Sequence, residues 1–175
     1  MLQEMREDTK DVIWKLQRKI HQNAVNKGFW KDNDNYGQKI ALIHSEISEA
    51  YKSFIFPEDC KSSFEEELAD VLIRMMDLAE HADFSLFLNV IDKHGCYFLL
   101  KSTDPINQLL QAHFFMSEAL EGLRKNDKDY FISMFSEAAV VIDQIAQLLK
   151  IDLSKAIKEK VKYNGTRGYK HGKAF

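Results

Sequence analysis

Two pairs of carboxylates, each pair spaced three residues apart, are the residues of this chain best suited to do chemistry. Glu46 and Glu49 form the first pair, and Glu67 and Asp70 form the second. Residues three apart on a helix lie on the same face, so two neighbouring helices could bring all four carboxylates together. Clustered carboxylates repel one another unless a cation lies among them, and oxygen ligands suit Mg²⁺ or Mn²⁺. The spacing therefore predicts a divalent-metal site that works on a phosphate substrate. The alternative is that the two pairs face water separately, each on its own helix.

The elements that would position these acids are helices. Helical periodicity runs through the chain, and no segment alternates apolar and polar residues convincingly enough to be a strand. Glycine, proline and serine signals divide the pattern into segments. The helices expected in the first half cover residues 3–26, 36–55, 64 to about 81, and about 85–93. The chain is therefore predicted to be an all-α helical bundle.

A helical wheel at about 100° per residue places the acids beside the core. The apolar face of the second helix is formed by Ile40, Ile43, Ile47, Ala50, Tyr51 and Phe54. Glu46 lies at the border of that face, and Glu67 lies at the border of the next helix's core face. A contiguous polar stripe on the third helix consists of Glu67, Asp70, Arg74 and Asp77. Such borders are where packed helices meet while still admitting solvent and a ligand.

The second half of the chain repeats the first in a degenerate form. Three matches carry the repeat: SEALE at 117–121 with SEISE at 45–49, EAAV at 137–140 with ELAD at 67–70, and IDLS at 151–154 with ADFS at 82–85. Val140 stands where the first half has Asp70, so only the first copy has the full acid set. We interpret the pattern as a degenerate internal duplication of a helical hairpin. The alternative is that any two helical hairpins look alike, because helical patterns are repetitive.

Length and composition indicate one globular domain, residues 1–175, with a hydrophobic fraction of 45% and a charged fraction of 29%. The expected division is a metal-binding hairpin at about 36–94, its degenerate copy at about 106–163, and a basic tail at 164–175. A net charge of −3 argues against a nucleic-acid partner. No apolar run approaches about 18 residues, so no membrane span is expected.

Cysteine usage and the N-terminal segment indicate the compartment. Cys60 and Cys96 do not form a disulfide framework, and reduced thiols are typical of the cytoplasm. The first residues are charged and contain no apolar stretch of the kind found in a signal peptide. We therefore expect a cytoplasmic protein.

Four sequence segments resemble one protein family. They are KGFW at 27–30, SEISEA at 45–50, EELADVLIR at 66–74, and KYNGTRGYKHGK at 162–173. Together they are similar to the MazG-like nucleotide pyrophosphohydrolases, an all-α superfamily that also includes the dimeric dUTPases. Gly168 departs from the pattern, since relatives often have proline there. A larger departure is the segment at roughly 84–150, because relatives run almost directly from the second acid pair to the tail.

The resemblance implies hydrolysis of a nucleoside triphosphate between the α- and β-phosphates, giving a monophosphate and pyrophosphate, with a role in removing noncanonical nucleotides. It implies that Glu46, Glu49, Glu67 and Asp70 hold Mg²⁺, with Mn²⁺ as a substitute. Either Glu46 or Glu49 would also be the catalytic base. The implied substrate-binding residues are Lys27, Trp30, Arg74, Lys162, Asn164, Arg167 and Lys170. Arg74 could instead form a simple ion pair, Trp30 could be ordinary packing, and the basic residues of the tail could be solvated.

Typical members of that family assemble from two or more chains, which predicts a homodimer. The second hairpin could instead replace the helices of a partner subunit. A non-catalytic nucleotide-binding or regulatory helical module is the alternative function, and a structural helical adaptor is a third. The intact acid quartet of the first hairpin favours the enzyme.

Overall fold

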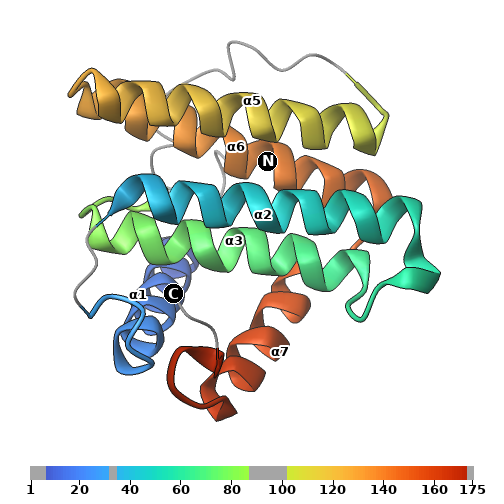
Figure 1. Ribbon diagram of the computed structural model, residues 1–175, viewed down its shortest axis with the longest axis horizontal. Coiled ribbons are helices and arrows are strands. Elements are labelled where there is room, and N and C mark those ends of the chain that lie inside the picture. The colour runs from blue at the N-terminus through green and yellow to red at the C-terminus, as the bar shows by residue number, and fades with distance from the viewer. Residues whose placement is uncertain (1–6, 32–34, 87–101, 173–175) are drawn as a thin grey trace.

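The computed structural model describes residues 7–31, 35–86 and 102–172. Within these residues the chain is helical and contains no strand, which confirms the all-α prediction. The α-helices are α1 (Glu7–Asn26), α2 (Tyr36–Ile55), α3 (Phe64–His81), α5 (Pro105–Arg124), α6 (Lys128–Leu149) and α7 (Leu153–Thr166) (Figure 1). Two short 3-10 helices, η2 (Pro57–Asp59) and η3 (Tyr169–Gly172), follow α2 and α7.

Capping residues explain why the helices that carry the acids begin where they do. The side chain of Asn35 accepts a hydrogen bond from the backbone of Gln38 at the start of α2. Ser63 and Glu66 form a reciprocal capping box at the start of α3. The predicted bounds 36–55 and 64–81 are therefore confirmed. Cys96 and the helix expected at about 85–93, apart from its first two positions, lie outside the described residues.

The helices form two stacked hairpins with two further helices below them. The α5–α6 hairpin lies on the α2–α3 hairpin, and α1 and α7 pack against α3 from the other side (Figure 1). Helix α3 contacts α1, α2, α6 and α7. It is therefore the central helix. Its side chains can reach α1, α2 and α7, which are the other helices that line the candidate site.

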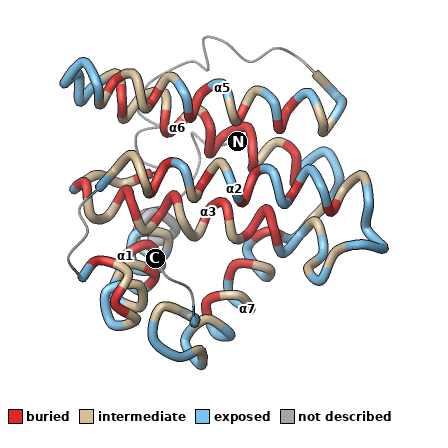
Figure 2. Tube along the Cα trace, viewed as in Figure 1, coloured by how far each residue is buried: buried red, intermediate tan, exposed pale blue. Residues whose placement is uncertain are grey.

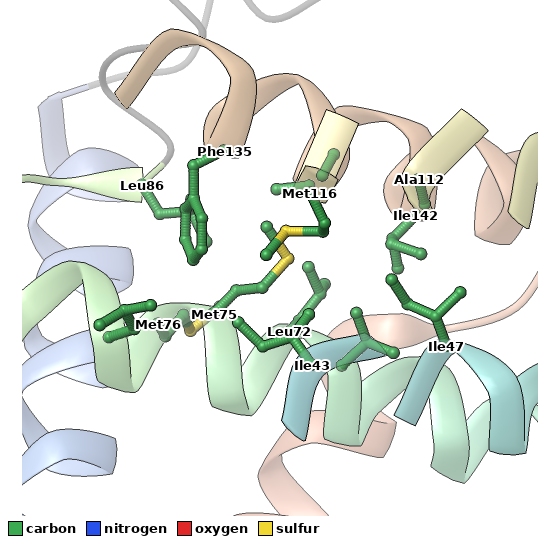
Figure 3. Packing of buried hydrophobic residues seen from close by; sticks show 14 of the residues in the cluster. Ile43, Ile47, Leu72, Met75, Met76, Leu86, Ala112, Met116, Phe135 and Ile142 are labelled. Atoms are coloured by element: carbon green, nitrogen blue, oxygen red, sulfur yellow. The ribbon is translucent and has the colours of Figure 1, made fainter. Parts of the chain in front are cut away.

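The core fills the space between the two hairpins. Figure 2 shows the buried positions of the helices turned toward one another, and Figure 3 shows apolar side chains from both hairpins pointing into the same space. Ile43 and Ile47 of α2 meet Leu72 and Met75 of α3 there, and Met116 comes from α5, all at most 2% exposed. Burial of each such side chain contributes roughly 1.5–3 kcal/mol. This packing fixes the faces of α2 and α3 that do not carry the acids.

Tyr51 departs from the expected apolar face of α2. It is 44% exposed, although the neighbouring positions Ile47 and Ala50 are fully buried. On the helical wheel it lies at the edge of the apolar stripe, where a tyrosine ring can cover the surface while its hydroxyl stays in water. The expectation that Tyr51 belongs to the core is wrong.

Helix α6 is the one described helix that is long and apolar enough to cross a membrane by length and composition alone. Half of its most apolar window is buried inside the bundle, where α6 packs on α5 and α3. A core helix of a soluble protein meets the same criteria, so this is weak evidence for a membrane span.

The C-terminal segment folds back onto the end of α1. Helix α7 continues to Thr166, so the first three residues of the expected basic tail are helical. The Lys27 side chain donates a hydrogen bond to the backbone oxygen of Arg167, and the Lys170 amide donates one of 2.8 Å to the Lys27 carbonyl. These bonds close the bundle on the side where α1, α3 and α7 meet.

Candidate metal centre

Three carboxylates converge between α2 and α3. One oxygen from each of Glu46, Glu49 and Glu67 lies within 4.8 Å of the others, and this is the one group of three or more acid, histidine or cysteine side chains found so close in the described part of the chain. Glu46 and Glu67 are each 6% exposed, whereas Glu49 is open to solvent. The group is therefore mostly buried and has one open side.

Burial and the crowding of these acids change the pKa of Glu67. Its pKa is raised from 4.5 to about 7, first by burial and then by the negative charges of Asp70, Glu49 and Glu46, while a hydrogen bond from Ser62 opposes the shift. A carboxyl with such a pKa holds a proton near neutral pH unless another cation replaces it. A divalent cation is the natural replacement, because it would relieve the repulsion among all of these acids.

Asp70 lies beside this group but is bound to a lysine from another helix. The Nζ of Lys160 on α7 lies 2.7 Å from Oδ2 of Asp70, and the two side chains are only 13% and 22% exposed. Burial raises the pKa of Asp70, and the bond to Lys160 opposes that rise. Asp70 is thus not among the three converging acids, although it lines the same pocket.

Arg74 is paired across the helices rather than along its own helix. Its Nε lies 2.5 Å from Oε1 of Glu46, and the Glu46 side chain is 8% exposed. The i, i+4 pair with Asp70 that the sequence allowed is replaced by this interhelical bond and by the bond between Asp70 and Lys160. Two of the four expected metal ligands therefore already have a basic partner.

A pocket of about 900 Å³ surrounds the acids. Each wall presents residues at the three- and four-residue spacing of one helix face. The polar lining comprises Asn23 of α1 and Lys27 just after it; Lys39, Glu46, Glu49 and Lys52 of α2; Asp59 of η2 with Lys61 and Ser62 after it; Glu67, Asp70, Arg74 and Asp77 of α3; and Lys160 and Asn164 of α7 with Arg167 just after it. Acids and bases are nearly balanced, so the pocket can take a cation and an anion together.

The expected substrate-binding residues divide into two groups. Lys27, Arg74, Asn164 and Arg167 line the pocket. Trp30, Lys162 and Lys170 are not part of the lining. Lys162 points to solvent on the exposed side of α7, two residues from Lys160.

Trp30 is packed in the interior and does not line the pocket. It is 9% exposed, its ring is stacked on His81 with the centroids 3.8 Å apart, and Nζ of Lys39 lies 4.2 Å from its ring centroid. This is the packing role that the sequence left open. The neighbouring Phe29, by contrast, does line the pocket.

Sequence reasoning missed Lys160 and Lys39. Helical phase contained the signal for Lys160: residues 160 and 164 share one face of α7, and Leu153, Ile157 and Val161 form the adjoining buried stripe. Lys162 lies on the opposite side of that helix. Lys39 could not be found in this way, because its burial depends on the fold of the turn around Trp30.

The second hairpin does not assemble an equivalent group of acids within its described residues. Glu118 accepts a hydrogen bond of 2.5 Å from the Tyr130 hydroxyl, and Glu121 is paired with Arg124. Val140, at the position that matches Asp70, is 8% exposed. Glu118 and Glu121 are therefore each engaged with a neighbour in their own hairpin.

Comparisons with protein families, with curated proteins and with solved structures found no match to this chain. What the pocket can do must therefore follow from its own chemistry. An all-oxygen donor set suits a hard divalent cation such as Mg²⁺ or Mn²⁺. Lysine and arginine side chains around it suit an oxyanion with several charges.

Proposed function

We propose that this chain is a Mg²⁺-dependent nucleotide pyrophosphohydrolase of the MazG-like type, which cleaves a nucleoside triphosphate between its α- and β-phosphates. The observation that carries the proposal is the convergence of Glu46, Glu49 and Glu67 inside a pocket that is also lined by basic side chains. A metal-bound triphosphate carries a divalent cation, which the carboxylates can bind, and phosphate oxyanions, which the basic side chains can bind. Removal of noncanonical nucleotides is the biological role that the family resemblance suggests.

Glu46, Glu49, Glu67 and Asp70 would hold the cation. Their donor set fits Mg²⁺ or Mn²⁺, because every donor is a carboxylate oxygen. When bound, the cation would offset negative charge on the phosphates and lower the pKa of a coordinated water.

Glu49 is the better candidate for the base that accepts the proton of the attacking water. Glu46 is bound to Arg74 and is nearly buried, whereas Glu49 faces the open side of the group. An acid with solvent access can exchange its proton after each turnover.

The remaining lining would hold the two ends of the substrate. Arg74, Asn164 and Arg167 can donate to phosphate oxygens, and Lys27 holds the last residue of that set in place through its bond to the Arg167 carbonyl. The apolar part of the lining is suited to a nucleobase; it consists of Ile20, Ala24, Phe29, Leu42, Ile73, Leu78 and Val161.

The degenerate duplication and the oligomeric state belong to the same proposal. The α5–α6 hairpin packs on the α2–α3 hairpin, and in this proposal it replaces the helices that a partner chain contributes in typical relatives. This arrangement favours a bundle completed within one chain over the homodimer expected from the resemblance. Light scattering of the purified protein distinguishes the two.

The test is release of pyrophosphate from a panel of deoxynucleoside and nucleoside triphosphates with Mg²⁺. Wild-type protein is compared with Glu49→Gln and with the matched control Glu121→Gln from the second hairpin. We expect turnover by the wild type and the control, and a loss of at least about 100-fold in Glu49→Gln. No turnover with any nucleotide, or equal turnover by both variants, would contradict the proposal.

A non-catalytic nucleotide-binding module is the second candidate. The ion pairs of Glu46 with Arg74 and of Asp70 with Lys160 favour it, because they satisfy two of the four acids within the protein. Calorimetry that finds Mg²⁺-dependent nucleotide binding without product formation would support this module over the enzyme.

A further inference from the structure

The bond between Asp70 and Lys160 joins a proposed metal ligand to a base from a different helix. The ammonium lies 2.7 Å from Oδ2, in a part of the pocket where both side chains are largely buried. Asp70 is not one of the three acids that converge, although its negative charge helps to raise the pKa of Glu67. An oxygen that accepts a hydrogen bond from an ammonium presents one lone pair fewer to a metal, and the positive charge repels any second cation.

Lys160 also shares a helix face with Asn164, which lies one turn further along α7. Arg167 directly follows the end of that helix, and all three residues line the pocket. A lysine side chain has a flexible four-carbon stem, and Lys160 lines the pocket, so its ammonium can move from Asp70 to an oxyanion there without displacement of the helix.

We propose that Lys160 is an exchangeable counter-ion of the metal site: Asp70 turns from Lys160 to the divalent cation when the cation binds, and the released ammonium binds a phosphate oxyanion in the same pocket. This inference rests on the proposed function. It makes the binding of cation and of phosphate mutually supportive, because each partner of the ion pair leaves it for a ligand of opposite charge. The empty protein keeps both groups neutralised, and neither ligand alone gains the full binding energy.

The test uses Lys160→Met and the matched control Lys158→Met, which removes an exposed lysine two residues earlier on α7. Binding of Mn²⁺ without phosphate is measured by the electron paramagnetic resonance of free Mn²⁺. Binding of magnesium pyrophosphate at saturating Mg²⁺ is measured by calorimetry. For Lys160→Met we expect Mn²⁺ to bind roughly 3- to 10-fold more tightly and magnesium pyrophosphate at least about 10-fold more weakly. The control should change neither affinity by more than about twofold.

Opposite changes in the two affinities are not expected from a residue that only supports the fold. A second variant, Asp70→Asn, addresses the same exchange without removal of the lysine. It should bind Mn²⁺ more weakly but bind pyrophosphate in the absence of metal more tightly than wild type, because Lys160 is no longer held. Circular dichroism confirms that each variant retains its helices.

The results separate the exchange from the proposed function. Equal Mn²⁺ affinity of wild type and Lys160→Met, or unchanged pyrophosphate binding by that variant, overturns the exchange while the metal site stands. Absence of Mn²⁺ binding by wild type overturns the metal site and the exchange together.

Discussion

The indole Nε1 of Trp30 donates a hydrogen bond of 2.8 Å to Oδ1 of Asp77. The same oxygen lies 2.7 Å from Nδ1 of His21 on α1. The Asp77 carboxylate therefore connects α3 both to α1 and to the turn that follows α1. Lys27 and Phe29, which line the pocket, lie in the segment held in this way.

Replacement of Asp77 by alanine should destabilise the protein. It leaves the indole N–H and the imidazole of His21 without their shared acceptor in a largely buried place. Each lost partner costs about 1–3 kcal/mol, and we expect a total loss near 2–3 kcal/mol in urea unfolding. Asp129→Asn, an exposed acid at the start of α6, is the control and should lose less than about 1 kcal/mol. Equal losses of unfolding free energy in the two variants would show that the hydrogen bonds of Asp77 do not stabilise the fold.

The close approach of Gly28 and Tyr169 gives a second prediction. Gly28 has φ of 81°, and a Cβ there would overlap the Tyr169 ring. Gly28→Ala should cost about 1–2 kcal/mol, because the left-handed backbone is strained for alanine, and should expose the 163–172 segment to limited proteolysis.

Gly165→Ala is the matched control for that change. Gly165 lies within α7, and a Cβ added there would meet none of the described atoms within 4 Å. Alanine there should instead stabilise the helix by about 0.5–1 kcal/mol. Identical proteolysis of both variants would argue against docking of the segment on Gly28.

The raised pKa of Glu67 gives the metal-free protein a pH-dependent stability. The folded state binds this proton more tightly than the unfolded chain, since the pKa rises from 4.5 to about 7 on folding. Stability should therefore fall as the pH rises from about 4.5 to about 7, by roughly 1–3 kcal/mol, and then level off. Glu67→Gln should flatten this dependence in thermal unfolding followed across the same pH range.

Saturating Mg²⁺ should reverse the trend, because the cation replaces the proton on Glu67. The rise in melting temperature that Mg²⁺ causes should be larger at about pH 8 than at about pH 6. An equal rise at both pH values would mean that the cation does not compete with that proton.

The helices that carry the acids could be predicted from sequence because their signals are local. The cap at Asn35, the capping box of Ser63 and Glu66, and Pro57 after the second helix all act within a few residues. The border positions of Glu46 and Glu67 likewise follow from helical phase, and both are nearly buried.

The partners of the acids could not be predicted, because they depend on how distant segments pack. Lys160 is ninety positions from Asp70 in the sequence, and only the docking of α7 on α3 brings them together. Arg74 has Asp70 at helical spacing on its own helix. The packing of α2 against α3 nevertheless places Glu46 beside Arg74, and these two side chains form the ion pair. The sequence left two roles open for Trp30, substrate binding and ordinary packing, and its stacking on His81 shows the packing role.

The two hairpins provide a comparison of equivalent acids. Glu46→Gln should weaken Mg²⁺ binding at least about 10-fold, because it removes a proposed ligand. Glu118→Gln, the matching change in the second hairpin, should leave that affinity within about twofold, since Glu118 is engaged with Tyr130. Calorimetry with Mg²⁺ alone checks both. A comparable loss in Glu118→Gln would place a second metal site in the α5–α6 hairpin.

Asn23 is the polar residue of the pocket best suited to read a nucleobase, because Ile20 and Ala24 of the apolar lining lie beside it on α1. It lies on the pocket face of α1 between Ile20 and Lys27, and its side-chain amide makes no hydrogen bond to the described residues. An amide offers both a donor and an acceptor, so it can distinguish bases by their polar edges. Asn23→Ala should therefore change the ratio of kcat/KM between the preferred nucleotide and its competitors by about 10-fold or more.

The control for this change is Gln22→Ala, on the exposed side of the same helix. It should leave the preference among nucleotides unchanged, because Gln22 bonds only to Asn26 within the described part of the chain. Pyrophosphate release from each nucleotide, measured for both variants, gives the ratios. If Asn23→Ala lowers kcat/KM equally for every base, Asn23 supports the pocket without reading the base, and selectivity must come from the shape of the apolar lining.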